Sequence, residues 1–419
     1  MASLAAELRV DVDRLTRRLA ALAEIGAIEG TEGCARLALT DEDKAGRDLV
    51  VSWMRDLGLA VSIDGIGNVV AVMSGEAAGA PVMTGSHIDT VRTGGRYDGN
   101  LGVLAGLEII ECLQQADITP PRDLAVAFFT DEEGARFPPD MLGSLVYVGG
   151  MSVEEAHAIE GIDGAILGTE LDRIGYLGSA PLPAQPPHAF VELHIEQGPV
   201  LEAEAITIGA VTGVQGISWT EVSVNGQSNH AGTTPMVLRK DPGVVAFRTA
   251  AFVRELATEL GAPQVATVGR MELHPNLVNV VPATARFTID LRHTDNDVLV
   301  DAEERTIAFL REAAADEGCT FETRRLARFD PVVFDERVVE SVEHAALTHG
   351  LTVRRMPSGA GHDAQMLARV CPTGMVFVPS VNGLSHNPAE YTAAADLEAG
   401  ANVLMQVMLD LAADRPPPA

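Results

Sequence analysis

Apolar and polar positions form short blocks along the first half of the chain. The segments NVVAVMSG, APVMTGS and DLAVAFFT have the length and apolar character of strands, and FVELHIEQG alternates apolar with polar residues. Between them, LGVLAGLEIIECLQQ repeats leucine and isoleucine at helical spacing. The repeated order of strand, helix and strand predicts an α/β fold with a mostly parallel sheet flanked by helices.

The pattern changes near Gly213 and returns after Phe329. For the stretch between them we expect a small antiparallel sheet and two helices, with strands at 217–224, 265–273 and 283–292 and helices at 242–260 and 297–314. Beyond it we expect helices at 338–349 and 362–369, strands near 352 and at TGMVFVPS, and a last helix from 392. A chain of 419 residues is also long for one core. The sequence therefore predicts two domains: a larger one of residues 1–213 and 330–419, and an inserted α+β domain of residues 214–329.

Composition narrows the classes of partner. The formal net charge of −29 argues strongly against a nucleic-acid partner or an anionic membrane surface, because both would repel the chain. No apolar run approaches the roughly 20 residues that span a bilayer. The four cysteines are widely separated and form no CxxC pair, which favours reduced thiols in a cytoplasmic protein. The N-terminus reads as an amphipathic helix and not as a signal peptide, and we expect the tail DRPPPA to be disordered.

Histidine and acidic residues gather just after predicted strands at four places: His87 with Asp89 and Asp98, Glu132 with Glu133, His194, and His386. In an α/β sheet the loops after the carboxyl ends of the strands meet at one crevice. Imidazole suits zinc, nickel or cobalt, and added carboxylate extends the choice to manganese. The pattern predicts a site for two divalent metal ions.

The spacing within these motifs refines the prediction. His87 and Asp89 lie on the same side of an extended segment, so we expect the Asp89 carboxylate to accept the second imidazole N–H. The glycines of TGGRYDGN allow Asp98 to return beside His87, and a carboxylate can bridge two metal ions. Of the adjacent Glu132 and Glu133, one can bind metal while the other accepts a proton from water.

Each feature has an ordinary interpretation when it is taken alone. DEE is typical of a solvated acidic turn, a glycine-rich loop often precedes a helix, and isolated histidines such as His157, His188 and His344 are typical of a surface or a satisfied core. Their joint occurrence at predicted strand ends favours a metal site.

Seven segments, spread over nearly the whole chain, carry a specific resemblance: GSHIDTVRTGGRYDGNLGVLAGLE, FTDEEGARF, HIEQGPVLE, NHAGTTPM, HPNLVNVVPATARFTIDLRH, SGAGHDAQMLA and VPSVNGLSHNPAEYT. The sequence resembles the M20 family of metallopeptidase-like enzymes and, within it, the amidase (hydantoinase/carbamoylase) branch. That branch contains N-carbamoyl-L-amino-acid hydrolases, which the sequence resembles most, allantoate amidohydrolases, ureidoglycolate hydrolases and β-ureidopropionases.

The resemblance implies a set of five metal ligands: His87, Asp98, Glu133, His194 and His386. Asp98 would bridge two divalent ions per subunit (Zn, Mn, Co or Ni), and Glu132 would be the general base. M20 peptidases commonly have a carboxylate where this branch has His194, so His194 favours an amidase. The inserted domain would act as a lid and a dimerisation domain of a homodimer.

The resemblance also places substrate-binding groups on the inserted domain, at His230, Asn279 and Arg292. The Arg292 guanidinium matches a substrate carboxylate, although a surface ion pair is the ordinary role of such an arginine. His230 can donate a hydrogen bond to a developing oxyanion. Three further residues lie in family motifs near the expected site: Gln197, Gly361 and His362.

The implied reaction is hydrolysis of the carbamoyl (ureido) C–N bond of an N-carbamoyl-L-amino acid to the amino acid, carbon dioxide and ammonia. Two alternatives remain. One is a related small-molecule ureido substrate such as allantoate, ureidoglycolate or a β-ureido acid, which would use the same metal ligands. The other is a non-catalytic metal-binding or interaction module, against which Glu132 argues, because metal binding alone needs no free base beside Glu133.

Overall fold

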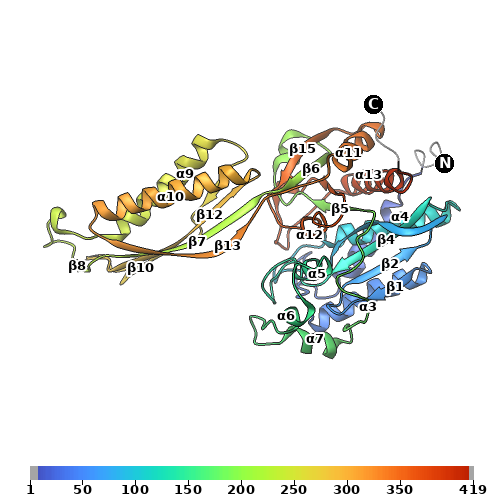
Figure 1. Ribbon diagram of the computed structural model, residues 1–419, viewed down its shortest axis with the longest axis horizontal. Helices are drawn as coiled ribbons and strands as arrows, with labels where there is room; N and C mark the ends of the chain where they lie inside the picture. Colours follow the sequence, from blue (N-terminus) through green and yellow to red (C-terminus); the bar gives the residue numbers. More distant parts are fainter. Residues whose placement is uncertain (1–7, 415–419) are drawn as a thin grey trace. The chain divides into compact units, whose positions relative to one another are not determined.

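The computed structural model describes residues 8–414, which divide into two compact units (Figure 1). Unit 1 contains Met1–Gly213 and Val333–Ala419, and unit 2 contains Val214–Val332. Part of the expected N-terminal helix and nearly all of the expected disordered tail lie outside the described residues.

Unit 1 is built on a nine-stranded sheet. In spatial order its strands are β1 (Ala60–Ile63), β2 (Val69–Met73), β4 (Arg122–Phe129), β3 (Ala77–His87), β5 (Ala189–Ile195), β16 (Thr373–Val378), β6 (Ile208–Val214) and β14 (Val332–Val333), with β15 (Val353–Ser358) paired to β6. The central strands β4, β3, β5 and β16 are parallel, whereas β1, β2 and β6 join the sheet antiparallel. This arrangement confirms the α/β prediction and directs the carboxyl ends of the central strands to one edge.

Helices cover the central strands. Helices α4 (Asn100–Gln115) and α13 (Ala394–Ala412) pack against each other and against β3, β4 and β5, while α5 (Leu142–Tyr147) and α12 (Asp363–Leu367) pack against each other near β4 and β5. All residues of β5 are buried, including Glu192 and His194, so its alternating pattern does not mark a solvent-exposed face. Among the described residues of unit 1, the remaining helices are α2 (Val12–Ala23), α3 (Asp41–Asp56), α6 (Val153–His157), α7 (Leu167–Ile174), α8 (Val200–Glu204), α11 (Glu336–Thr348) and η2 (Val381–Gly383).

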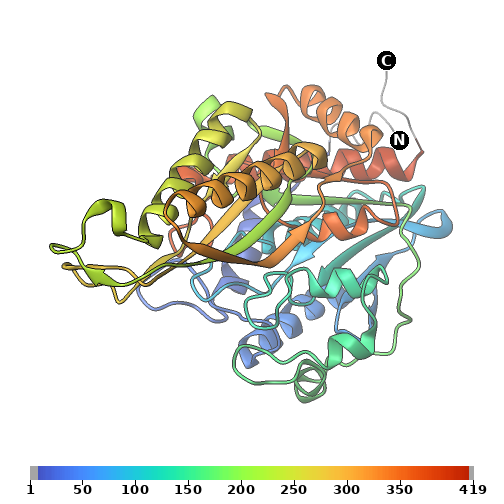
Figure 2. The ribbon, with the colours of Figure 1, turned by 60° about the vertical axis from the view of Figure 1, so that its left-hand side comes forward.

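Unit 2 is a five-stranded antiparallel sheet with two helices. The strands are β10 (Met271–His274), β12 (Thr284–His293), β7 (Gly216–Asn225) and β13 (Thr320–Phe329), with β9 (Val265–Thr267) also paired to β12. Helices α9 (Pro242–Leu260) and α10 (Asn296–Asp316) lie side by side on the sheet (Figure 2). Val222, Phe287 and Leu291 point into the resulting core. A separate ribbon pairs β8 (Asn229–His230) with β11 (Val280–Val281), and η1 (Met236–Leu238) follows β8.

Two expected elements differ from the structure, and strand β13 was not expected. The single strand at 265–273 is two strands, because three residues (268–270) lie opposite two residues of β12 (288–289) and form a β-bulge. The helix at 362–369 is shorter, at Asp363–Leu367. Strand β13 was not predicted, because it is an edge strand whose residues are mostly exposed and carry no alternating pattern.

Within the described residues, no helix combines the length and the apolar character that crossing a membrane requires.

Candidate metal centre

The ends of three neighbouring parallel strands supply the first group of polar side chains. His87 is the last residue of β3, Glu132 and Glu133 follow β4 by three and four residues, and His194 is the penultimate residue of β5. Because β3 lies between β4 and β5 in the sheet, these side chains are brought to one edge.

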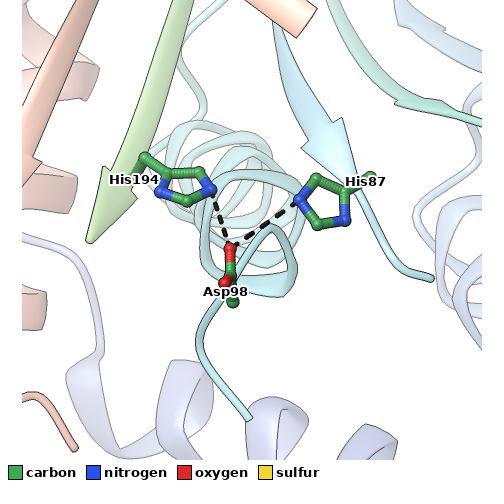
Figure 3. A group of neighbouring side chains, drawn as sticks. All are labelled: His87, Asp98 and His194. Carbon is green, nitrogen blue, oxygen red and sulfur yellow. Dashed lines mark ion pairs between the residues drawn. The ribbon is translucent and has the colours of Figure 1, made fainter. Parts of the chain in front are cut away.

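Asp98 reaches the same place from the loop before α4. Its Oδ1 lies 3.2 Å from His194 Nε2 and 3.8 Å from His87 Nε2, and it sits between the two rings (Figure 3). Gly99 allows this close return: its φ is +66°, and an added Cβ would lie 2.4 Å from the His87 ring. A residue with a side chain could not occupy position 99 without displacing His87.

A second group shares Asp98 with the first. His386, on the loop after η2, has its Nε2 3.1 Å from Glu133 Oε2 and 3.5 Å from Asp98 Oδ2. The ligand atoms of His87, Asp98 and His194 lie within 4.8 Å of one another, and so do those of Asp98, Glu133 and His386. The two oxygens of Asp98 therefore face different groups.

The imidazole tautomers suit metal binding. Nδ1 of His87 lies 2.9 Å from the Asp89 carbonyl, and Nδ1 of His194 lies 2.9 Å from the Ile195 carbonyl. With the proton on Nδ1, each Nε2 directs its lone pair toward Asp98. The Gly99 N–H donates to His194 Nε2 at 3.3 Å, as this tautomer requires.

The role expected for the Asp89 carboxylate was wrong. The His87 ring uses the backbone carbonyl of Asp89, while the nearer carboxylate oxygen is 4.0 Å from Nδ1. That carboxylate accepts the backbone N–H groups of Glu132 and Glu133, each at 3.3 Å. Asp89 therefore fixes the turn that presents the two glutamates.

Charge is concentrated in this centre. Burial lowers the pKa of His194, but without a bound cation the hydrogen bond and the charge of Asp98 outweigh it and raise that pKa to about 9, so a cation at Nε2 would take the place of this second proton. The hydrogen bond to Glu133 raises the pKa of His386 to about 9. Burial, followed by the charges of Asp363, Glu133, Asp89 and Glu192, raises the pKa of Glu132 well above its usual range.

These residues fit divalent cations. The donors are imidazole nitrogens and carboxylate oxygens, which zinc, manganese, cobalt and nickel all accept. Glu132, Glu192 and Asp363 are further carboxyl groups, and all three are buried, whereas His386 of the second ligand group is exposed. Since buried carboxylates are costly unless they are paired or bind metal, cations would stabilise their charged forms.

Three other predicted residues of unit 1 lie close to the two ligand groups. The Gln197 amide donates to Asp98 Oδ2 at 2.9 Å. The buried His362 ring lies 4.5 Å from the His194 ring, centroid to centroid, and its Nε2 is 2.8 Å from Ser358 Oγ. At Gly361 an added Cβ would lie 2.8 Å from Met141 Cε, so the backbone passes tightly there.

The predicted residues of unit 2 lie on its strands and ribbon. His230 and Asn279 are adjacent on the ribbon, since the Ala231 N–H donates to the Asn279 carbonyl at 2.9 Å. Arg292, on β12, donates from Nε and Nη2 to the Asp290 carboxylate at 3.0–3.2 Å. Its guanidinium carbon is 5.9 Å from the centre of the Trp219 ring. Asp290 thus holds the side of the guanidinium on which Nε lies.

Sequence reasoning missed three polar residues that lie beside this centre, Glu192, Ser385 and Glu390, and a fourth, Asp363, whose charge acts on Glu132. The alternation in β5 placed Glu192 on an apparently polar face, whereas its carboxylate is buried and accepts Ser86 Oγ at 2.6 Å. The motif SHNPAEY contains both Ser385 and Glu390 beside His386, and this proximity was the signal that could have identified them.

Comparison with known proteins gives consistent matches. The sequence profile of peptidase family M20/M25/M40 matches residues 83–410. An N-carbamoyl-L-amino-acid amidohydrolase from Rhizobium meliloti is 41% identical over 96% of this chain and 97% of its own length. An allantoate amidohydrolase from Bacillus subtilis is 36% identical over 93% of this chain and 95% of its own. The crystal structure of an amidase of the hydantoinase/carbamoylase family from Burkholderia multivorans superposes with a TM-score of 0.95 at 45% identity, covering 97% and 99% of the two chains.

Proposed function

The chain belongs to peptidase family M20/M25/M40, and from that premise we propose that it hydrolyses the carbamoyl (ureido) C–N bond of N-carbamoyl-L-amino acids. It is an amidohydrolase that acts on C–N bonds other than peptide bonds, as its relatives over the full chain are. The products would be the L-amino acid, carbon dioxide and ammonia. The observation that carries the proposal is the pair of ligand groups that share Asp98, with Glu132 beside them.

Two divalent ions per subunit would be held by these groups, one by His87, Asp98 and His194 and the other by Asp98, Glu133 and His386. When bound, such ions supply Lewis-acid polarisation of a carbonyl oxygen and lower the pKa of a coordinated water. Nitrogen and oxygen donors of this kind bind zinc, manganese, cobalt or nickel alike.

Glu132 is the residue that moves protons in this proposal. Its Oε2 lies 3.4 Å from His87 Nε2, so it borders the first ligand group without belonging to either. It would accept a proton from the attacking water and return it to the leaving nitrogen. Its buried, acidic surroundings raise its affinity for a proton, which a base working near neutral pH requires.

Three side chains of unit 2 would bind polar groups of the substrate. Arg292 would bind the carboxylate through charge-assisted hydrogen bonds, Asn279 would bind the same carboxylate or the ureido group, and His230 would donate to the developing oxyanion. In unit 1, Gln197, Gly361 and His362 would line the substrate site beside the metal ligands. The free side-chain amide oxygen of Gln197 has no hydrogen-bond partner among the described residues, which supports a role in binding a polar group.

A second candidate reaction uses the same centre. Relatives named allantoate amidohydrolase and ureidoglycolate hydrolase align over most of the chain at 34–38% identity. Their substrates also carry ureido groups and carboxylates, so the metal ligands do not separate the two reactions.

Ammonia release tests the choice directly. The metal-loaded protein is incubated in parallel with N-carbamoyl-L-methionine, N-carbamoyl-β-alanine, allantoate and ureidoglycolate. We expect the highest kcat/KM with N-carbamoyl-L-methionine. Faster turnover of allantoate or ureidoglycolate would move the assignment to the second reaction, and no release from any of the four would refute the ureido class.

Two broader proposals accompany the reaction. We propose a homodimer formed through unit 2, where Met236, Val237, Leu238, Leu277 and Val278 expose large apolar side chains. Light scattering of the protein, and of a variant with Val237 and Val278 changed to serine, tests this.

The four cysteines are free thiols, which supports a cytoplasmic location.

A further inference from the structure

One loop carries both the metal-ligand candidate His386 and a buried carboxylate, Glu390. The Glu390 side chain is almost fully buried, and its Oε1 accepts the backbone N–H groups of Tyr97 at 3.0 Å and Asp98 at 3.1 Å. Glu390 therefore holds the backbone at Asp98, the residue that both ligand groups share. Asp98 and Glu390 are 292 positions apart in the chain, so this contact joins two separate loops.

Further contacts join the same two loops. Ser385 Oγ lies 2.9 Å from Asp98 Oδ2 and 3.4 Å from Glu390 Oε2. Thr93 Oγ1 donates to the His386 carbonyl at 3.2 Å. The loop of Asp98 and the loop of His386 are thus held together on both sides, and Glu390 makes the connection to the Asp98 backbone.

Gly95 provides independent evidence that this carboxylate has a fixed place. A Cβ at position 95 would lie 2.2 Å from Glu390 Oε1 and 2.3 Å from its Cδ. The backbone of the Asp98 loop passes directly against the carboxylate, so a side chain at this position and Glu390 in its present place exclude each other.

We propose that Glu390 is a positioning residue that fixes Asp98 relative to His386 and so sets the affinity of the metal position that these two ligands and Glu133 form. This inference rests on the proposed metal-dependent function. The physical reason is that a carboxylate accepting two N–H groups holds the backbone in one place, and loss of such outer partners costs about 10–100-fold in metal affinity. The other position also contains Asp98, but its two other ligands, His87 and His194, are held by β3 and β5, so we expect it to be less affected.

Three variants test the proposal in the full-length protein. Glu390→Ala removes the acceptor, and Gly95→Ala displaces the carboxylate without altering it. Glu390→Gln keeps an oxygen that can accept both N–H groups, so it should restore most of the affinity lost in Glu390→Ala. Glu196→Ala is the matched control, because the buried Glu196 also accepts two backbone N–H groups, from Val200 and Leu201, but at the start of α8. Gly269→Ala, where an added Cβ meets nothing within 4 Å, controls for the glycine change.

The measurement is Co²⁺ binding to chelator-stripped protein, followed by visible absorption in competition with a chelator, with thermal unfolding of the metal-free proteins beside it. We expect wild type to bind two Co²⁺ per subunit. In Glu390→Ala and Gly95→Ala one of the two affinities should fall about 10–100-fold while the other changes by less than about 3-fold. Glu390→Gln should lose less than about 10-fold, and both controls should bind as wild type does.

Wild-type affinities in both Gly95→Ala and Glu390→Ala would overturn the positioning role, as would an equal loss in Glu196→Ala. If Glu390→Ala does not fold, Gly95→Ala decides, and wild-type affinities in that variant would overturn the role. Failure of wild type to bind Co²⁺ would instead refute the proposed metal-dependent function, so the two failures are distinguishable.

Discussion

Replacing Arg292 with alanine should separate substrates by their carboxylate. In the structure Asp290 accepts hydrogen bonds from Nε and Nη2 of Arg292, and the two side chains are about one quarter exposed, at 24% for Arg292 and 28% for Asp290. A guanidinium has five N–H groups, so Arg292 would bind a substrate carboxylate in addition to Asp290. A charge-assisted bond of this kind contributes about 1.5–3 kcal/mol, or about 10- to 150-fold in binding.

The pairing of Arg292 with Asp290 leads us to expect the upper end of that range. Arg292→Ala removes the bond and also leaves the Asp290 carboxylate near the substrate carboxylate, where like charges repel. We therefore expect KM for an N-carbamoyl-L-amino acid to rise toward about 150-fold, with metal content unchanged. In Asp290→Asn/Arg292→Ala the repulsion is absent, and KM should rise only about 10-fold. Arg286→Ala is the matched control, because Arg286 lies on strand β12 and on the same face of that strand as Arg292. The KM of the Arg286→Ala enzyme should stay within about twofold of wild type.

Steady-state ammonia release is measured for the N-carbamoyl-L-amino acid and for the corresponding carboxamide, which lacks the negative charge. The carboxamide should lose much less than the acid from Arg292→Ala. Equal losses for both substrates would show that Arg292 does not bind the carboxylate, and the substrate class would then have to be abandoned.

Three further predictions concern unit 1. Glu132→Gln should keep its metal and lose at least about 10²-fold in kcat, and near-wild-type turnover would remove Glu132 from proton transfer. Asp98→Ala should lose both ions, whereas His386→Ala should lose one, and elemental analysis distinguishes the two outcomes. Arg47→Met should lower the free energy of unfolding by about 3–5 kcal/mol, since it leaves Asp43 buried and unpaired after breaking a 2.7 Å ion pair that is 0% exposed on both sides. Urea denaturation measures that loss of stability. Adding Asp43→Leu to Arg47→Met should partly restore the free energy of unfolding. A loss in the double variant as large as in Arg47→Met alone would contradict the reasoning.

The sequence predicted those parts of the fold whose burial follows a simple period. The strands before His87 and Glu132 and the helix Pro242–Leu260 have continuous or periodic apolar positions, and the structure confirms them. Strand β13 has no such period. It is an edge strand that pairs only with β7, and most of the β13 side chains remain exposed, so its apolar and polar residues do not alternate. The bulge at 268–270 depends on pairing with β12, which the local sequence does not encode.

The candidate centre shows the same division. His87, Glu132 and His194 could be proposed from local sequence because each lies at a strand end, and parallel strands place their ends together. The contact of Glu390 with the Asp98 backbone could not, since it joins loops far apart in the chain. The sequence also could not show that the His87 ring contacts the carbonyl of Asp89 and not its carboxylate. That carboxylate accepts hydrogen bonds from the backbone N–H groups of Glu132 and Glu133, in a turn distant in the sequence.

Metal titration of the active protein tests the central claim most directly. Chelator-stripped enzyme is titrated with Mn²⁺ while ammonia release from N-carbamoyl-L-methionine is followed, and bound metal is measured at each point. Activity should be absent in the stripped protein and should reach its plateau at two ions per subunit. Full activity in protein shown to contain no metal would contradict the account.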